Sequence, residues 1–325
     1  MSIIKNTRKG KFSNVLMLYF LVVLLAGCIK EDLSICGIVV KFKYDLNTDG
    51  IDKFTSEMEK LNLFVFNERG DLVHEANMTG PFGSNFSVRL QLPAGKYSFI
   101  VGGNLNDDTF LSTALGSRLS ERRMNYNAPQ NTVSEHPEPF YYGARNAVSI
   151  KVLGNEEVLI PMMKVTKEVK VIFNGIPIDN TSEGNFVCRI DAANGDYTFN
   201  NIPPADARML TYLPERLVEA AAYKITDDFV TLRLFENNQC KSTITLIYYP
   251  PDGSAPVEIL NMPLTDAIKQ AYTDGEGGDG WQNFFIIRDV FVLEFNITHT
   301  FGNFTIEANG WNSVDGGGSN HGVIG

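Results

Sequence analysis

The sequence predicts an all-β protein made of two tandem β-sandwich domains. Short segments of alternating apolar and polar residues recur along the chain, and turns rich in Gly, Pro and Asn separate them. Strands of about five residues with such turns are typical of sandwich folds. The series of strands restarts near residue 162, and 325 residues is enough for two domains at about 100–200 residues each.

The N-terminus has the features of a cleaved signal. A basic region opens it, with Lys5, Arg8, Lys9 and Lys11. The apolar run that follows, residues 15–25, is shorter than the about 20 residues of a membrane-spanning helix but suits a signal peptide. Leu25-Ala26-Gly27-Cys28 resembles the bacterial lipoprotein box. The resemblance implies cleavage before Cys28 and a covalent lipid on it, as the chain's only cofactor.

Alternatives to a lipoprotein are an uncleaved helical anchor and a plain secretory signal. Stable membrane anchoring takes two lipid signals, and a lipidated N-terminal Cys carries two or three acyl chains. Lys30-Glu31-Asp32 also resembles the short charged signal that sends lipoproteins of Bacteroides-type bacteria to the outer cell surface. We therefore expect an outer-membrane, lipid-anchored, surface-exposed protein.

Composition argues against a nucleic-acid partner. Removing residues 1–27 takes four of the 28 basic residues and no acidic ones, which leaves 24 basic against 38 acidic residues. Affinity for nucleic acids comes largely from Lys and Arg at phosphates, and no basic run compensates for the deficit. A hydrophobic content of 44% supports ordinary buried cores.

The number and positions of the cysteines allow one disulfide bond. With Cys28 lipidated, Cys36, Cys188 and Cys240 remain, and an odd number leaves at least one thiol unpaired in an oxidising compartment. Cys188 and Cys240 lie in the same half of the chain and could pair if their strands are neighbours.

In the first half, alternation predicts strands at residues 38–44, 61–66, 71–76, 86–92, 97–101, 140–143, 147–153 and 157–161. Short helices are expected near 54–60 and 110–118. In the second half, strands are expected at residues 164–173, 186–190, 230–235, 242–249, 257–260, 284–295 and 300–308, with a helix at 265–272.

The expected organisation has five parts. They are a signal peptide (1–27), a lipidated linker (28–36), an N-terminal sandwich (37–162), a C-terminal sandwich (163–314) and a flexible Gly-rich tail (315–325).

One stretch has side chains at the spacing of calcium ligands. Asp45, Asn47 and Asp49, followed by Gly50, match the first half of an EF-hand loop. The twelfth position is Ser56 where Glu is needed, and the stretch follows a strand, so an Asx-rich turn is the better interpretation and no metal is expected.

Motifs for catalysis are missing from the sequence. None of the four His residues lies in a zinc-protease motif, and neither a nucleophile elbow nor a P-loop occurs. Adjacent carboxylates such as Asp107 and Asp108 would point to opposite faces of a strand. We therefore expect no enzymatic activity.

Several phrases together resemble one family. They are Cys28-Ile-Lys-Glu-Asp-Leu-Ser-Ile-Cys36, Phe42-Lys-Tyr-Asp-Leu-Asn47, Leu63-Phe-Val-Phe-Asn-Glu-Arg-Gly70, Leu92-Pro-Ala-Gly-Lys-Tyr97, Phe140-Tyr-Tyr-Gly143 and Gly310-Trp311. In this order, after a lipoprotein box, they are similar to the fimbrial anchor-subunit lipoproteins that tether type V pili of Bacteroides-type bacteria. The resemblance covers most of the mature chain. It implies transthyretin-like sandwiches, a lipid anchor at the base of a fimbrium, and fimbrial stalk subunits as partners.

The resemblance also implies assembly by strand addition. Stalk subunits of this family lose their first strand to proteolysis, and a neighbour's C-terminal strand fills the groove. An anchor would keep its first strand, so we expect contact with the fimbrium through the C-terminal domain, with Phe304, Ile306, Trp311 and Val314 as the candidate assembly strand. Arg69, Arg89, Arg122 and Arg123 are the candidate cleavage sites. The alternative function is a surface glycan-binding lipoprotein, with Trp281 as its aromatic platform.

Overall fold

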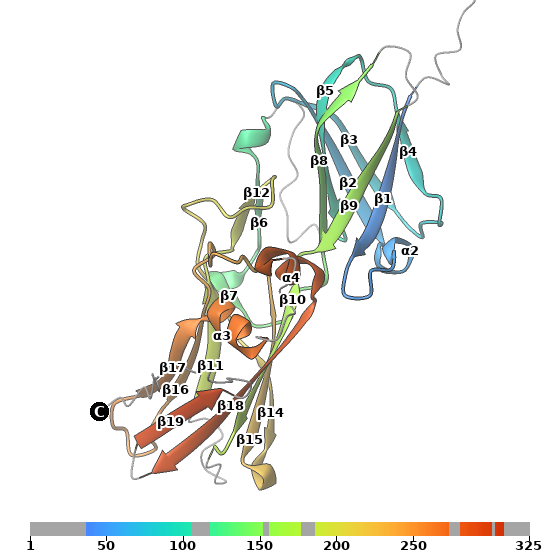
Figure 1. The fold of residues 1–325 in the computed structure, drawn as a ribbon. Helices are drawn as coiled ribbons and strands as arrows, with labels where there is room; N and C mark the ends of the chain where they lie inside the picture. The colour runs from blue at the N-terminus through green and yellow to red at the C-terminus, as the bar shows by residue number, and fades with distance from the viewer. Residues whose placement is uncertain are drawn as a thin grey trace, which may run out of the picture.

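A computed structural model describes residues 37–105, 118–151, 156–176, 186–272, 280–300 and 303–308. It shows two all-β domains arranged end to end, which confirms the predicted fold class (Figure 1). Within these ranges no helix has the length and apolar character that a membrane crossing requires. The predicted helix at 110–118 lies almost entirely outside them.

The N-terminal domain is one seven-stranded sheet with the order β3-β2-β5-β8-β9-β1-β4. Its strands are β1 (Ile38–Leu46), β2 (Lys60–Asn67), β3 (Leu72–Thr79), β4 (Ser87–Leu90), β5 (Gly95–Gly103), β8 (Tyr141–Ile150) and β9 (Glu157–Lys164). β8 and β9 pair only from Tyr141 to Gly143, so the sheet folds over at this corner into two layers. The short helix α2 (Phe54–Glu57) follows β1.

The core of this domain is built from alternate residues of facing strands. Leu61, Leu63 and Val65 of β2 are fully buried against the inward side chains of β1, β5 and β9. The intervening β2 residues Phe64 and Phe66 belong to a different cluster, the core of the second domain. Both faces of β2 are therefore covered, one by its own sandwich and one at the junction between the domains.

The C-terminal domain is a sandwich of two five-stranded sheets, β14-β15-β10-β18-β19 and β17-β16-β11-β13-β7. Its strands are β10 (Lys167–Asn174), β11 (Phe186–Ala192), β13 (Leu210–Tyr212), β14 (Glu215–Glu219), β15 (Lys224–Thr231), β16 (Thr243–Tyr248), β17 (Val257–Pro263), β18 (Val290–Thr300) and β19 (Asn303–Ala308). β7 (Thr132–Val133) joins from the first half of the chain.

Two helices cover the end of this sandwich next to the N-terminal domain (Figure 1). α3 (Leu264–Ala271) lies close to the predicted helix. α4 (Trp281–Ile287) occupies the first part of the strand predicted at 284–295, and that prediction was wrong there. Phe284 and Phe285 lie three and four residues after Trp281, which is helical spacing, and both are buried in the core.

The chain crosses between the domains more than once. β6 (Arg123–Asn125) pairs with β12 (Asp196–Thr198), and β7 extends the second sandwich, although both precede β8. β6 and β7, which lie in the range assigned from the sequence to the first sandwich, therefore pair with strands of the second half of the chain. The boundary drawn after residue 162 falls inside β9.

The two domains place their first strands in the same way. β1 lies between β4, antiparallel, and β9, parallel. β10 lies between β15, antiparallel, and β18, parallel. In each domain the first strand is therefore interior, with hydrogen-bonded neighbours on both sides.

Candidate assembly site

Strand β1 is the first strand of the chain, which the family resemblance implies that an anchor subunit keeps. Its side chains alternate as the sequence predicts: Ile38, Val40, Phe42 and Tyr44 are buried. Full burial of one such side chain stabilises the fold by about 1.5–3 kcal/mol. The four together therefore contribute a free energy comparable to the net unfolding free energy of a whole domain, about 5–15 kcal/mol. The domain would not survive loss of β1 without a replacement strand.

The turn after β1 is closed by its own side chains. The Asn47 side-chain amide donates to the carbonyl oxygens of Tyr44 and Ile51 at 3.0 and 2.8 Å, and its oxygen accepts the Asp49 N–H at 3.1 Å. Asp45 pairs with Lys43, and Asp49 pairs with Lys53. The weak metal candidate Asp45, Asn47 and Asp49 is thus an Asx-rich turn, and the described part of the chain contains no cluster of ligand type.

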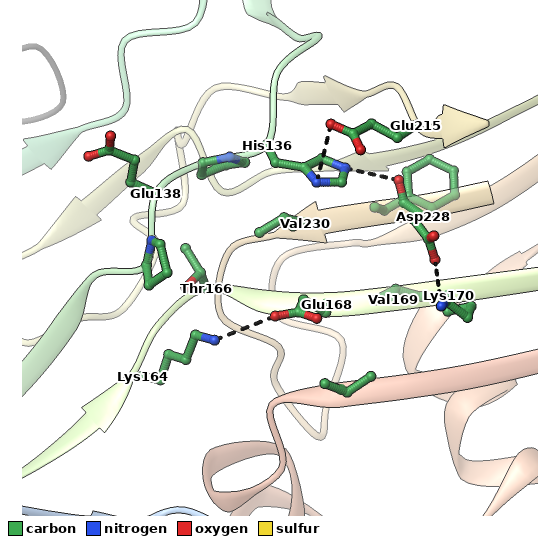
Figure 2. A pocket seen from close by; sticks show the side chains of 14 residues that line it. His136, Glu138, Lys164, Thr166, Glu168, Val169, Lys170, Glu215, Asp228 and Val230 are labelled. Carbon is green, nitrogen blue, oxygen red and sulfur yellow. Dashed lines mark hydrogen bonds and ion pairs between the residues drawn. The ribbon is translucent and has the colours of Figure 1, made fainter. Parts of the chain in front are cut away.

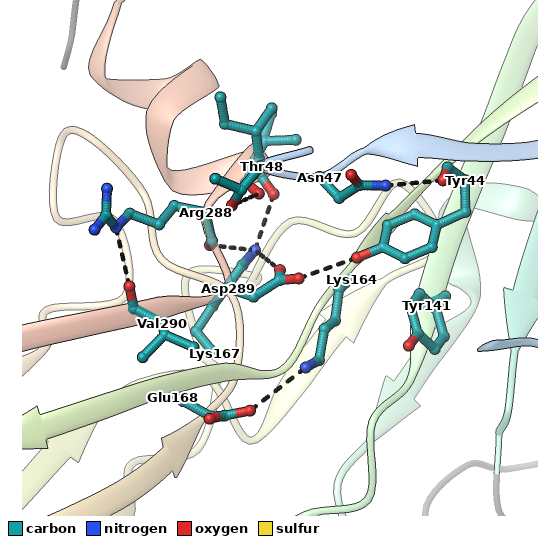
Figure 3. Close-up of polar contacts among 12 residues, drawn as sticks. Tyr44, Asn47, Thr48, Tyr141, Lys164, Lys167, Glu168, Arg288, Asp289 and Val290 are labelled. Atoms are coloured by element: carbon teal, nitrogen blue, oxygen red, sulfur yellow. Dashed lines mark hydrogen bonds and ion pairs between the residues drawn. The ribbon is translucent and has the colours of Figure 1, made fainter. Parts of the chain in front are cut away.

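A buried lysine marks the junction between the domains. Lys167, at the start of β10, is completely buried, and its ammonium donates to the carbonyl oxygens of Ile286 and Arg288 at 2.9 and 2.8 Å (Figure 3). The third bond goes to the Asp289 carboxylate at 3.1 Å. All three donors are used, which is the condition for burying a charged lysine. Burial nevertheless lowers the pKa of Lys167 to about 8, and Asp289 opposes the shift.

The junction continues into the N-terminal domain through β1. Tyr44 donates its hydroxyl to the second oxygen of Asp289 at 3.1 Å, and Thr48 donates to the carbonyl oxygen of Ile287 at 3.3 Å. Tyr141 packs edge-on against Tyr44 and donates to Glu57 at 2.8 Å. Burial is the main cause that raises the pKa of both tyrosines above the ordinary value, so both remain neutral donors. We call Tyr44, Lys167 and Asp289 the junction triad.

A second contact between the domains is aromatic. Phe199, after β12, packs edge-on against Phe64 and Phe66 of β2, and the Arg122 guanidinium lies over the Phe66 and Phe199 rings at 5.4 and 5.6 Å. The Tyr142 hydroxyl donates to the Phe199 carbonyl oxygen at 3.0 Å. Arg122 is only 2% exposed, so this candidate cleavage site is hidden from a protease in the folded protein.

The remaining sequence predictions fall in different places. Phe304 and Ile306 lie in β19, where the Phe304 ring packs against Tyr248 at 5.0 Å. Cys28, Trp311 and Val314 lie outside the described residues.

The disulfide predicted as an option is not formed. Cys188 and Cys240 are buried free thiols, Cys188 in β11 and Cys240 before β16. The Cys240 sulfur lies 3.8 Å from the Arg233 carbonyl oxygen. Burial raises the pKa of the Cys240 thiol to about 12 and that of Cys188 well above its ordinary value.

The junction triad was not predicted from the sequence, although a signal for Lys167 was present. Val165, Val169, Val171 and Phe173 keep a period of two, and Lys167 occupies the missing inward position. A lysine in the apolar phase of a strand indicates a buried, paired charge. Its partner Asp289 is 122 residues away, and no local pattern points to it.

Fold and junction together define a two-domain, all-β protein whose first strand is bonded into both domains. The chain belongs to the family of fimbrillin-A associated anchor proteins Mfa1 and Mfa2, whose family model matches residues 33–316. This establishes a fimbrial structural and adhesion role and a location in the cell envelope; proteins of this kind are typically not enzymes.

Solved structures share the fold. The fimbrial anchor protein Mfa2 from Porphyromonas gingivalis is 18% identical, with a TM-score of 0.68 over 85% of this chain and 97% of that one. A candidate polysaccharide-binding protein from Bacteroides thetaiotaomicron is 22% identical, with a TM-score of 0.70 over 85% and 96%. A candidate adhesin from Bacteroides ovatus is 18% identical, with a TM-score of 0.68 over 88% and 98%. A search of curated proteins found no match.

Proposed function

We propose that this chain anchors a fimbrium to the outer membrane through a lipid on Cys28 and limits the length of the polymer. The supporting observation is the position of β1, which is paired on both sides and bonded through Tyr44 to the second domain. Only eight residues separate Cys28 from Gly37, the first described residue. The lipid would therefore hold the protein by a strand that is integral to its fold.

The sequence after β1 supports retention of this strand. In stalk subunits, a cut after the first strand opens the groove for a neighbour. Residues 47–59, which connect β1 to β2, contain no arginine. Of the candidate cleavage sites, Arg69 lies in the turn after β2 with an 83% exposed side chain, and Arg122 is buried. A cut at Arg69 leaves β1 joined to β2, so the groove stays filled and the polymer ends here.

The C-terminal domain would then contact the stalk subunit by β-strand addition, with this chain as the donor of the strand. β19 is the edge strand of its sheet, and Phe304, Ile306 and Ala308 pack against the core. Phe304 and Ile306 are therefore already part of the sheet and core of this domain. Only the residues of the candidate assembly strand that follow Ala308, Trp311 and Val314, remain to be donated to a stalk subunit. A variant that lacks Trp311 and Val314 and still retains its fimbriae would exclude donation by this segment.

The alternative function, a surface glycan-binding lipoprotein, has less support. The Bacteroides thetaiotaomicron neighbour carries a polysaccharide-binding description, and Trp281 was the proposed platform here. Trp281 instead begins α4 and packs against Phe284 and Phe285 at 5.3 and 6.1 Å. Its ring is therefore engaged in the core and is only partly available for stacking on a sugar.

Deletion of the gene tests the anchor function directly. The measurement is the number and length of fimbriae on cells and in the medium. Long fimbriae shed into the medium are the expected result, and a Cys28→Ala chain should reproduce the shedding. Unchanged, cell-bound fimbriae would contradict anchoring and favour the glycan-binding alternative, which a polysaccharide-affinity assay would then check.

A further inference from the structure

The two sides of the C-terminal sandwich differ in how they are closed. On the side of β14 the chain passes directly from one sheet to the other, because only Leu213 and Pro214 separate β13 from β14. His136 lies over the same side: its Nε2 donates to the carbonyl oxygen of Asp228 at 3.0 Å, and its Nδ1 lies 3.7 Å from the Glu215 carboxylate (Figure 2). On the side of β19 the chain passes from β17 to β18 through α3 and α4, at the end next to the N-terminal domain, and no described connection crosses the rest of this side (Figure 1).

The edge strands β17 and β19 contact each other on this second side, which we call the β17–β19 edge. Five apolar side chains of this edge pack against the core but are only partly buried: Tyr248, Met262, Phe304, Ile306 and Ala308. In the middle of the sheet that contains β19, by contrast, Val171 and Leu293 are 0% and 1% exposed. Because burial of apolar surface is favourable, a further element that covers this edge would stabilise the domain.

Strand β19 is suited to accept such an element. It is the edge of its sheet, and an edge strand presents backbone N–H and C=O groups to a further strand. All six residues of β19 pair with β18 in one continuous register, and none of them is Pro or Lys. The ladder of β17 with β16 is interrupted by a bulge beside Ile247, and β17 ends at Pro263. Bulges and prolines blunt an edge strand, so β19 is the more receptive of the two edges.

The residues after β19 have the sequence of a hairpin. Asn309-Gly310 follows Ala308, and Trp311-Asn-Ser-Val314 comes next. Asn-Gly is the strongest short signal for a two-residue hairpin loop, because a type I′ turn needs positive φ at both positions. The family model matches the chain as far as residue 316, so this segment belongs to the part that the chain shares with its family. The local sequence therefore favours a strand that returns along the outer edge of β19.

A two-residue loop fixes the register of this returning strand. Trp311 would pair with Ala308 and Asn312 with Glu307, and paired residues share a face of the sheet. Glu307 is exposed and Ala308 packs against the core, so Asn312 would face solvent and Trp311 would face the β17–β19 edge. The small side chain of Ala308 leaves room for the indole, and a Trp side chain buries about 150–250 Å².

We propose that residues 311–314 fold back on β19 as the last strand of the domain and that Trp311 covers the β17–β19 edge. The occupant is this chain's own segment because the loop holds it beside β19 at a roughly millimolar effective concentration, above that of a separate partner. The segment is also the one proposed for donation to a stalk subunit, and this link alone rests on the proposed function. A stalk subunit would have to displace the strand from β19 before it could receive it.

A cross-link between Glu307→Cys and Asn312→Cys in the purified full-length protein tests the register. Both side chains would lie on the outer face, so the pair reports strand position without altering the core. Glutathione disulfide is the oxidant: the two thiols give up their hydrogens to form the bridge, and the oxidant is reduced to two glutathione thiols. The fragment released by cleavage after Arg288 contains no other cysteine, so its mass shows whether the bridge is internal.

The matched control is Glu307→Cys with Ser313→Cys, whose side chains would face opposite sides of the sheet. This control should cross-link at least about tenfold more slowly, because Cβ vectors that point apart cannot be bridged without backbone movement. Adding Gly310→Val to the first pair should slow its cross-link about tenfold, because the loop needs a left-handed conformation there. Gly316→Val, beyond the segment, should leave the rate unchanged.

Three results would each overturn the proposal. They are equal rates for the two cysteine pairs, a rate that Gly310→Val does not change, and bridges that join two molecules, which would assign the edge to a second copy of the chain. Fimbriae shed after gene deletion without an internal bridge would leave the anchoring function standing and remove the hairpin alone. An internal bridge together with unchanged, cell-bound fimbriae would do the reverse.

Discussion

Replacing Asp289 with Asn tests the junction triad. The change keeps the shape of the side chain but leaves the buried Lys167 ammonium without its counter-charge. Removing one partner of a buried ion pair costs about 3–5 kcal/mol. The Asp289 side chain is one-quarter exposed, at 25%, so water compensates part of the loss, and we expect about 3 kcal/mol.

The assay is urea denaturation followed by circular dichroism, arranged as a double-mutant cycle. Lys167→Met removes the charge but leaves the Ile286 and Arg288 carbonyls without a donor, at an expected cost of about 2 kcal/mol. With the ammonium absent, adding Asp289→Asn should cost less than about 1 kcal/mol more. The coupling energy of the pair is then about 2 kcal/mol.

Lys170 provides the matched control. It lies in the same strand and pairs with Asp228 at 3.5 Å, but both side chains are more than 40% exposed. Lys170→Met should cost less than about 1 kcal/mol. Equal effects of Lys170→Met and Asp289→Asn, or a coupling energy near zero between Lys167 and Asp289, would refute the view that this pair holds the domains together.

Three other predictions follow from the same structure. Burial lowers the pKa of Lys167 to about 8, below the ordinary 10.5 of the unfolded chain, so the unfolded state binds more protons at this lysine between these values and the contribution of Lys167 to the unfolding free energy should rise from pH 8 to pH 10. The buried thiols Cys188 and Cys240, whose pKa values burial raises, contribute in the opposite direction over this range, so the quantity to measure is the difference in unfolding free energy between the wild type and Lys167→Met in urea titrations at several pH values. This difference should shift in favour of the wild type as the pH rises, and a difference that does not change with pH would contradict the assignment. Phe42→Ala should cost about 3–5 kcal/mol, whereas Lys41→Ala, at an exposed ion pair with Glu157, should cost less than about 1 kcal/mol in the same urea experiment; similar costs would show that β1 is not a core strand. In limited digestion with an Arg-specific protease, cleavage should occur at Arg69 well before Arg122, as read by peptide mass, because Arg69 is 83% exposed and Arg122 is 2% exposed; early cleavage at Arg122 would mean that the junction opens readily.

Local pattern predicted the strands that bury one face. Val40, Phe42 and Tyr44 alternate with Lys41 and Lys43, and β1 lies where this alternation places it. α4 was missed because Phe284 and Phe285 were counted as the start of the apolar run that continues into β18. A short apolar run fits a helix and a buried strand equally well, and only packing decides between them.

Long-range partners could not be predicted in this way. The pairing of β6 and β7 with the second domain depends on strands of two or three residues, too short to show a period. Asn47 was recognised as a turn residue, but its neighbour Thr48 also contacts Ile287, 239 residues later. Such contacts depend on how the two domains dock, which no single segment encodes.

The parallel pairing of β1 with β9 has a mechanical consequence. The chain enters β1 at the end of the molecule far from the second domain and leaves β9 toward that domain (Figure 1). A pull between residue 37 and the second domain therefore draws the two strands along their axes in opposite directions. All hydrogen bonds of the ladder share such a shearing force at once, whereas a force across the strands would open them one after another. A load between the start of β10 and the end of β18 meets the same geometry, so a pull along the molecule's long axis is resisted by two sheared ladders in series.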